Sequence, residues 1–187
     1  MGKRSKFERN PRDFYPTPYE AVIPLIPFIQ FWGIEENMKF YEPCAGDGAL
    51  IRHLTKTMKC CGASDINPQN PPHESFIKTI DCLELRKKDL NGADYIITNP
   101  PWDRELLQPI LDHLLTGRTK FWFLLSGDWM HTKWAILYLR HCTKIVSIGR
   151  VKWIPASKFS SKENSCWYLF EPERFAHDMT VFYPRLP

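Results

Sequence analysis

Four consecutive residues in the middle of the chain, Asn99-Pro100-Pro101-Trp102, could together hold a planar amine. The two prolines remove two backbone donors, stiffen the chain and bias Asn99 toward an extended conformation. We expect the side-chain oxygen of Asn99 and the carbonyl of Pro100 to face one space. Two acceptors there would favour the pyramidal form of an NH2 group, whose lone pair can attack, while Trp102 could stack on the attached ring. A proline-rich turn that only ends a strand is the alternative.

A glycine-containing segment further upstream could receive a nucleoside. In Glu42-Pro43-Cys44-Ala45-Gly46-Asp47-Gly48, the two glycines permit a tight turn and a close approach of the backbone to a ligand. The N-terminus of the helix expected to follow would point into the same site. The dinucleotide fingerprint G-x-G-x-x-G fails, because Ile51 stands at the third glycine position. An ordinary strand-to-helix turn is the alternative here.

Two acidic residues follow the next expected strands. Asp65 could accept hydrogen bonds from both hydroxyls of a ribose, and Ile66 could cover one face of an adenine. Asp81, after a weaker strand, could reach the adenine amine. A helix cap or a turn is the alternative for each carboxylate. With these residues upstream, residues 99–102 predict methyl transfer from a nucleoside-containing donor to an amine.

The elements that must position these residues alternate between strand and helix, which is typical of a mostly parallel sheet covered on both faces. A helix is expected to begin at Thr17, with Thr17 and Glu20 as a capping box, Pro18 in the first position, and Pro24 and Pro27 shortening it. Segment 149–164 has no helical period, so the last strand is predicted to run antiparallel. The predicted strands are 39–42, 59–64, 75–78, 93–98, 119–125, 142–148 and 165–170, and the predicted helices are 48–57, 102–115 and 129–140. Ligands of such sheets bind at the carboxyl ends of the strands, where we expect the site.

Composition limits the class of protein. The 187 residues, 43% hydrophobic and 25% charged, predict one globular domain. No apolar run is long enough for a bilayer, and the start lacks a signal core, so we expect a cytoplasmic protein. The six cysteines include no C-x-x-C pair, so we predict no metal site. The net charge is +4. Two clusters of basic residues could contact phosphates or could simply be solvated: Lys3, Arg4, Lys6, Arg9 and Arg12, and Lys144, Arg150, Lys152, Lys158 and Lys162.

Taken together, these motifs resemble those of the amino-methyltransferases that act on N6 of adenine, above all the small DNA adenine methyltransferases of phages and prophages. The matching pieces, in the family's order, are residues 13–18 (Asp-Phe-Tyr-Pro-Thr-Pro), 42–48, 64–66, 97–102 and 150–153, with a serine-rich loop before Trp167. The resemblance implies a Rossmann-like class I methyltransferase fold, with a seven-stranded sheet whose last strand is antiparallel. It also implies S-adenosyl-L-methionine as cofactor, adenine N6 in DNA as target, and the cytoplasm of a bacterial host as location.

The resemblance implies roles for individual residues as well. Those expected to bind the cofactor are Tyr15, Thr17, Glu42, Cys44, Gly46, Gly48, Asp65, Ile66, Asp81 and Asn99. Those expected in catalysis are Asn99, Pro100 and Trp102, and those expected to line the base pocket are Pro101, Trp102, Trp153 and Phe159. Within the first set, Thr17 would lie near the cofactor carboxylate. Many DNA enzymes of this type have Asp where Asn99 stands, whereas Asn is also found among RNA and protein methyltransferases.

We expect a single methyltransferase domain over 1–187. Residues 1–37 would form a basic arm and a cofactor-covering helix, and residues 38–187 the catalytic core. Segments 66–95 and 171–187 are too short for a separate target-recognition domain, so recognition would come from loops, the arm or a protein partner, with weak sequence specificity. The expected partner is nucleic acid, DNA before RNA. The alternatives are a tRNA or rRNA methyltransferase, a glutamine methyltransferase, which would usually have Tyr at position 102, and a non-catalytic binding module.

Overall fold

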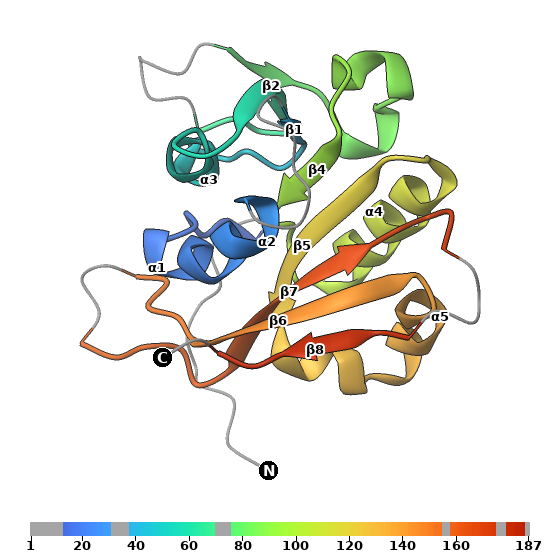
Figure 1. The fold of residues 1–187 in the computed structure, drawn as a ribbon. Coiled ribbons are helices and arrows are strands. Elements are labelled where there is room, and N and C mark those ends of the chain that lie inside the picture. Colours follow the sequence, from blue (N-terminus) through green and yellow to red (C-terminus); the bar gives the residue numbers. More distant parts are fainter. Residues whose placement is uncertain (1–12, 31–37, 70–75, 155–157, 175–178, 186–187) are drawn as a thin grey trace.

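One mixed sheet forms the centre of the protein in the computed structural model, which describes residues 13–30, 38–69, 76–154, 158–174 and 179–185 (Figure 1). Its order is β3-β2-β1-β4-β5-β7-β6-β8. The strands are β1 (Lys39–Glu42), β2 (Lys59–Asp65), β3 (Ile77–Thr79), β4 (Tyr95–Thr98), β5 (Lys120–Ser126), β6 (Cys142–Arg150), β7 (Asn164–Phe170) and β8 (Val181–Tyr183). The order reverses at β1, whose neighbours are β2 and β4, and such a switch point leaves a crevice at the carboxyl ends of the strands.

The directions of the strands confirm a mostly parallel sheet. Strands β1 to β5 pair in parallel, whereas β7 runs antiparallel to both β5 and β6. The predicted number of seven strands is wrong by one, because β8 adds in parallel to β6. This strand has only three residues, and Val181 and Phe182 are both exposed, so it shows no alternation of apolar and polar residues.

Helices cover both faces of the sheet (Figure 1). On one face lie α1 (Tyr19–Val22), the 3₁₀ turn η2 (Ile23–Leu25), α2 (Ile26–Gln30) and α3 (Ala49–Leu54). On the other lie α4 (Arg104–Thr116), the 3₁₀ turns η3 (Cys82–Glu84), η4 (Lys87–Leu90), η5 (Gly127–His131) and η6 (Lys133–Ala135), and α5 (Ile136–Leu139). No helix in the described ranges is long and apolar enough to span a membrane.

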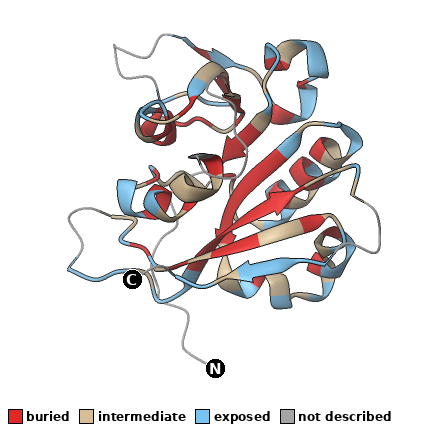
Figure 2. Ribbon diagram, viewed as in Figure 1, coloured by how far each residue is buried: buried red, intermediate tan, exposed pale blue. Residues whose placement is uncertain are grey.

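The two faces of the sheet bury separate cores, and strand β5 shows why. Phe121, Phe123 and Leu125 belong to the core beneath α4, whereas Trp122 and Leu124 belong to the core beneath α1 to α3. Successive side chains of a strand point to opposite faces, so a strand covered on both sides is apolar throughout. Buried residues accordingly follow the central strands in Figure 2, and the edge strand β8 is largely exposed.

Two predictions about helices are wrong for local reasons. Segment 129–140 is not one helix, because Thr132 is extended, with a ψ of 147°, and separates η5 from η6. The capping box at residues 17–20 is also absent, since Pro18 is the residue before α1 and no side chain caps that helix. The carboxylate of Glu20 instead accepts a hydrogen bond from the backbone N–H of Lys152 at 2.7 Å. The prolines do shorten the helix as expected, with Pro24 inside η2.

Candidate active site

A cavity of about 900 Å³ lies where β1, β2 and β4 end, in the crevice expected from the strand order. Its volume is within the range of small-molecule and cofactor sites, roughly 300–1,000 Å³. The structure brings most of the predicted residues to its wall: Tyr15, Thr17, Glu42, Cys44, Gly46, Asp65, Ile66, Asp81, Asn99 and Pro101. Residues from both the glycine segment and the Asn99 segment therefore face one space.

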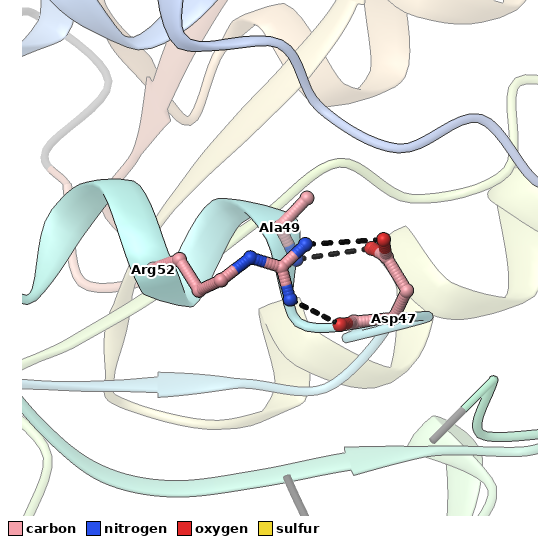
Figure 3. A network of polar contacts seen from close by, with 3 residues as sticks. All are labelled: Asp47, Ala49 and Arg52. Carbon is pink, nitrogen blue, oxygen red and sulfur yellow. Dashed lines mark hydrogen bonds and ion pairs between the residues drawn. The ribbon is translucent and has the colours of Figure 1, made fainter. Parts of the chain in front are cut away.

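The loop between β1 and α3 needs both of its glycines. Gly46 has a φ of +53°, and a Cβ there would lie 2.6 Å from the ring atom Cε2 of Phe14. Gly48 has a φ of +78° and precedes α3 without lining the cavity, so its role is conformational. Figure 3 shows how Asp47 fixes this turn: its carboxylate accepts from the N–H of Ala49 at 3.0 Å and pairs with Arg52 at 3.1 Å, while Arg52 also donates to its carbonyl.

Asp65 joins the end of β2 to the glycine loop. One carboxylate oxygen accepts from the N–H of Gly46 at 2.8 Å, and the other accepts from the N–H of Asn67 at 2.7 Å. A carboxylate offers roughly four acceptor positions, so two remain for a ligand. Asp65 can thus act as part of the turn and still accept hydrogen bonds from a diol.

Glu42 is a carboxyl group buried in the wall of the cavity. Glu42 is 1% exposed, and its Oε1 accepts from the N–H of Cys44 at 3.3 Å. The buried hydroxyl of Thr98 is near enough to the carboxyl to lower its pKa, but neither Oε2 nor that hydroxyl makes a hydrogen bond of good geometry with a described residue. Burial raises the pKa of Glu42 from 4.5 to about 8, so the group is mostly neutral at neutral pH. A buried polar atom without a partner is costly, and at a cavity wall it marks a place for a polar ligand group.

Cys44 and Cys82 form a thiol pair in the same wall. The hydrogen bond with Cys82, together with burial, raises the pKa of Cys44, so this thiol stays protonated. No group of three or more His, Cys, Asp or Glu that could hold a metal ion occurs in the described part of the chain. The two sulfur atoms supply polarizable surface to the cavity.

The acid after β3 and its apolar neighbours complete this half of the cavity. Asp81 accepts from the N–H of Leu83 at 2.9 Å and so caps η3, which was the alternative left open for it. Ile66 and Leu83 both line the cavity, although they are 51% and 42% exposed. Leu83 was not predicted, and only its position beside Asp81 could have drawn attention to it. These side chains offer apolar surface to a flat ligand.

The side-chain amide of Asn99 is held at both ends. Its Nδ2 donates to the hydroxyl of Thr17 at 3.2 Å and to the carbonyl of Tyr15 at 3.4 Å. Its Oδ1 accepts from the indole Nε1 of Trp102 at 3.2 Å. An amide oxygen has two lone pairs, so Oδ1 can accept one further hydrogen bond.

The predicted aromatic residues lie outside the wall of this cavity. The indole of Trp102 is half-buried, donates to the carbonyl of Leu124 at 2.9 Å, and meets Trp153 edge to face with ring centroids 5.4 Å apart. Pro100 is buried beside it, and Phe159 is 80% exposed and does not reach the cavity. Stacking of Trp102 on a substrate ring stays a prediction. The role of Trp153 in a base pocket stays a prediction as well.

Two further residues line the cavity without having been assigned a role. Asp13 accepts from the backbone N–H of Trp102 at 2.9 Å, and Phe14 packs on Gly46. Both stand in the motif of residues 13–18, which was the signal available in the sequence. Helix α4 forms a further side of the cavity, which the sequence did not lead us to expect. This side comprises Glu105, Leu106, Pro109 and Ile110.

The fold is the Rossmann-like fold of class I methyltransferases. The chain is similar in structure to a protein from Pyrococcus horikoshii provisionally described as an RNA methyltransferase (TM-score 0.61, 16% identity, 89% of this chain and 93% of that one). It is also similar to a protein from Listeria monocytogenes provisionally described as a class I S-adenosylmethionine-dependent methyltransferase (0.61, 10%, 93% and 66%).

A third similar structure is the methyltransferase subunit of a type I restriction-modification system from Streptococcus thermophilus (TM-score 0.52, 13% identity, 86% of this chain). The match spans 45% of the length of that subunit. No protein-family model matches the chain, and no curated protein matches it in sequence. At these identities the comparisons establish the fold.

Proposed function

We propose that this protein is an S-adenosyl-L-methionine-dependent methyltransferase that methylates the exocyclic N6 amine of adenine in DNA. The observation that carries the proposal is the position of Asn99. Asn99 lines the same cavity as Asp65 and the glycine loop, and its side-chain amide is held in one orientation. An acceptor suited to an amine and acceptors suited to a nucleoside therefore share one space.

The residues present fit this cofactor. Oε2 of Glu42 lacks a partner, and the cofactor's methionine end carries an ammonium group that could donate to it. Asp65 retains acceptor positions for the ribose hydroxyls, and Ile66 and Leu83 supply apolar surface for the adenine ring. When bound, the cofactor supplies an electrophilic methyl group on a sulfonium.

The protein's contribution to the transfer is orientation of the amine. A hydrogen bond from the amine to Oδ1 of Asn99, and a second to the carbonyl of Pro100, would turn its lone pair out of the ring plane and aim it at the methyl group. A strong general base is not required, because the amine becomes acidic once it carries the methyl group. Trp102 and Trp153 would form the aromatic wall that receives the ring.

A nucleic-acid target is supported by charge beside this wall. The last residue of β6, Arg150, is exposed, and the segment that follows it carries the exposed residues Lys152, Lys158 and Lys162 and includes Trp153. The basic arm 1–12 lies outside the described residues. An enzyme that acts on a paired base must flip it out of the duplex. We propose one domain over 1–187 without a separate recognition domain, and therefore weak sequence specificity or recognition through a protein partner.

An RNA base is the second candidate target. The observation that favours it is the similarity to the Pyrococcus horikoshii protein, which is described as an RNA methyltransferase and is covered over 93% of its length. The DNA target is supported by the resemblance of the motifs to phage enzymes and by the similarity to the restriction-modification subunit. The chemistry at Asn99 is the same in both cases.

A substrate panel tests the proposal. The protein is incubated with methyl-labelled S-adenosylmethionine and, separately, duplex DNA, single-stranded DNA, RNA and host proteins, and the products are digested and identified by mass spectrometry. N6-methyldeoxyadenosine is the expected product, methylated ribonucleosides would establish the second candidate, and methylglutamine would contradict both.

The cofactor site is tested in parallel by titration calorimetry. Asp65→Ala should weaken binding of S-adenosylmethionine, because the ribose hydroxyls lose their acceptor. Thr55→Val, at an exposed site after α3, serves as control and should bind like the wild type.

A further inference from the structure

The segment of residues 13–17, here called the brace, contacts the loop of residues 99–102 at two places. Near its start, the carboxylate of Asp13 accepts from the backbone N–H of Trp102. Near its end, the hydroxyl of Thr17 and the carbonyl of Tyr15 accept from Nδ2 of Asn99. The two segments are more than eighty residues apart in the chain, with separations of 82 to 89 between bonded partners.

These hydrogen bonds decide which way the amide of Asn99 points. The indole N–H of Trp102 can only donate, so it requires the amide oxygen on its side. The carbonyl of Tyr15 can only accept, so it requires the amide nitrogen on the other side. Thr17 provides the shorter contact to that nitrogen, at 3.2 Å against 3.4 Å for Tyr15. Rotating the amide by half a turn would place two acceptors together and two donors together.

Thr17 lines the cavity, and its side chain is at the same time part of this arrangement. It is 5% exposed, although it follows an exposed Pro16 and precedes an exposed helix start at Tyr19. Pro18 occupies the N-cap position of α1, so the hydroxyl of Thr17 does not cap that helix. The hydroxyl is directed to Asn99 instead.

Asp13 shows a second sign that the brace is shaped for this contact. Its φ is +58°, in the left-handed region that residues other than glycine rarely adopt. Such conformations persist where surrounding structure holds them and concentrate at functional sites. At Asp13 the conformation accompanies a carboxylate hydrogen bond to the backbone of Trp102.

We propose that the brace positions the amine-binding loop, with Thr17 and Asp13 as positioning residues for methyl transfer and Thr17 not a ligand of the cofactor carboxylate. The inference rests on the proposed function, because the amine acceptor that Thr17 orients is Asn99. Thr17 anchors the amide nitrogen of Asn99 in the orientation that Tyr15 and Trp102 set, and Asp13 fixes the backbone of Trp102. Both residues would act on the rate of transfer and leave cofactor affinity unchanged.

The deciding experiment compares Thr17→Val with Thr17→Ser. Valine keeps the shape of threonine and removes the hydroxyl, whereas serine keeps the hydroxyl, and Thr55→Val is the matched control at an exposed threonine. At saturating cofactor, Thr17→Val should lower kcat about 3- to 10-fold, the equivalent of one hydrogen bond, and leave the Kd for S-adenosylmethionine unchanged. Thr17→Ser should restore most of the rate. A raised Kd with unchanged kcat would make Thr17 a cofactor ligand and overturn the proposal.

A spectroscopic readout separates this inference from the proposed function. The side-chain NH2 signals of Asn99 are assigned in a ¹⁵N correlation spectrum by their absence in Asn99→Asp. Thr17→Val should shift these signals, and Thr55→Val should not. If they do not move, the brace does not hold the amide and the inference fails. If they move while the wild type methylates no substrate, the brace is established and the proposed function is wrong.

Asp13 is tested by a pair of substitutions matched for backbone conformation. Asparagine tolerates positive φ and keeps an acceptor, and glycine tolerates it without one. Asp13→Gly should therefore lower kcat and speed hydrogen exchange of the Trp102 amide, while Asp13→Asn should retain both properties. If Asp13→Gly and Asp13→Asn have the same kcat and the same exchange rate at the Trp102 amide, the carboxylate of Asp13 does not position residues 99–102.

Discussion

The buried carboxyl of Glu42 makes the stability of the protein depend on pH in a defined direction. Burial raises its pKa from 4.5 to about 8, whereas in the unfolded chain the group ionises near its ordinary pKa. Above that pH the folded state binds a proton that the unfolded state has released. The free energy of unfolding therefore falls as pH rises from the unfolded pKa toward about 8, and levels off beyond it.

Glu42→Gln removes this titration at nearly constant size. Between about pH 6 and about pH 9, the wild type should lose about 2–3 kcal/mol of unfolding free energy that Glu42→Gln does not lose. Urea unfolding of both proteins without cofactor, followed by circular dichroism, gives the difference, and the contributions of other titrating groups cancel in it. Parallel pH dependence of the two proteins would refute the burial of a neutral carboxyl at this position.

Two further substitutions follow from the geometry of the cavity. Gly46→Ala should lower the free energy of unfolding by more than Gly92→Ala does, as measured by thermal or urea unfolding. Both glycines have positive φ, but only a Cβ at Gly46 would meet Phe14. Equal losses of stability in the two variants would contradict the close approach of Phe14 to Gly46. Trp102→Phe keeps a ring but removes the N–H that binds the oxygen of Asn99, so kcat should fall about 3- to 10-fold while calorimetry shows unchanged cofactor affinity. An unchanged kcat would show that this N–H does not orient the amide.

The sequence was sufficient to predict the elements whose residues carry a local pattern. Residues 121–125 of strand β5 are all apolar and buried. An unbroken apolar run of this kind is typical of a strand covered on both faces, so the sequence indicated a central parallel strand. Because the carboxyl ends of parallel strands meet at one edge, the sequence alone predicts that Glu42, Asp65 and Asn99 lie together.

The same local patterns failed where distant partners compete for a group. Thr17 and Glu20 have the spacing of a capping box, but Asn99 and Lys152 bind their side chains instead. Tertiary hydrogen bonds of this kind leave no periodic trace in the chain. Thr132 is a local case. It interrupts a segment whose apolar spacing predicted one helix, and its hydroxyl and N–H both donate to the carbonyl of Trp129, three residues earlier.

The orientation of residues 99–102 could not have been predicted from composition or spacing. Residues 99–102 indicated two acceptors for an amine, and the structure adds that the oxygen of Asn99 already accepts from Trp102. It also adds the contact between Asp13 and the backbone of Trp102, which depends on an unusual φ. The contact with Asp13 arises from the packing of the N-terminal segment against residues that follow β4, which no local pattern records.

Methyl transfer by an Asn99→Ala variant tests the central claim most directly. Wild type and variant are given labelled S-adenosylmethionine and an adenine-containing oligonucleotide, and N6-methyladenine is quantified in a single turnover, with cofactor affinity measured by calorimetry. We predict that the variant binds the cofactor nearly as the wild type does and forms no detectable methylated base. Full activity of Asn99→Ala, or a wild type that methylates no exocyclic amine, would contradict the account.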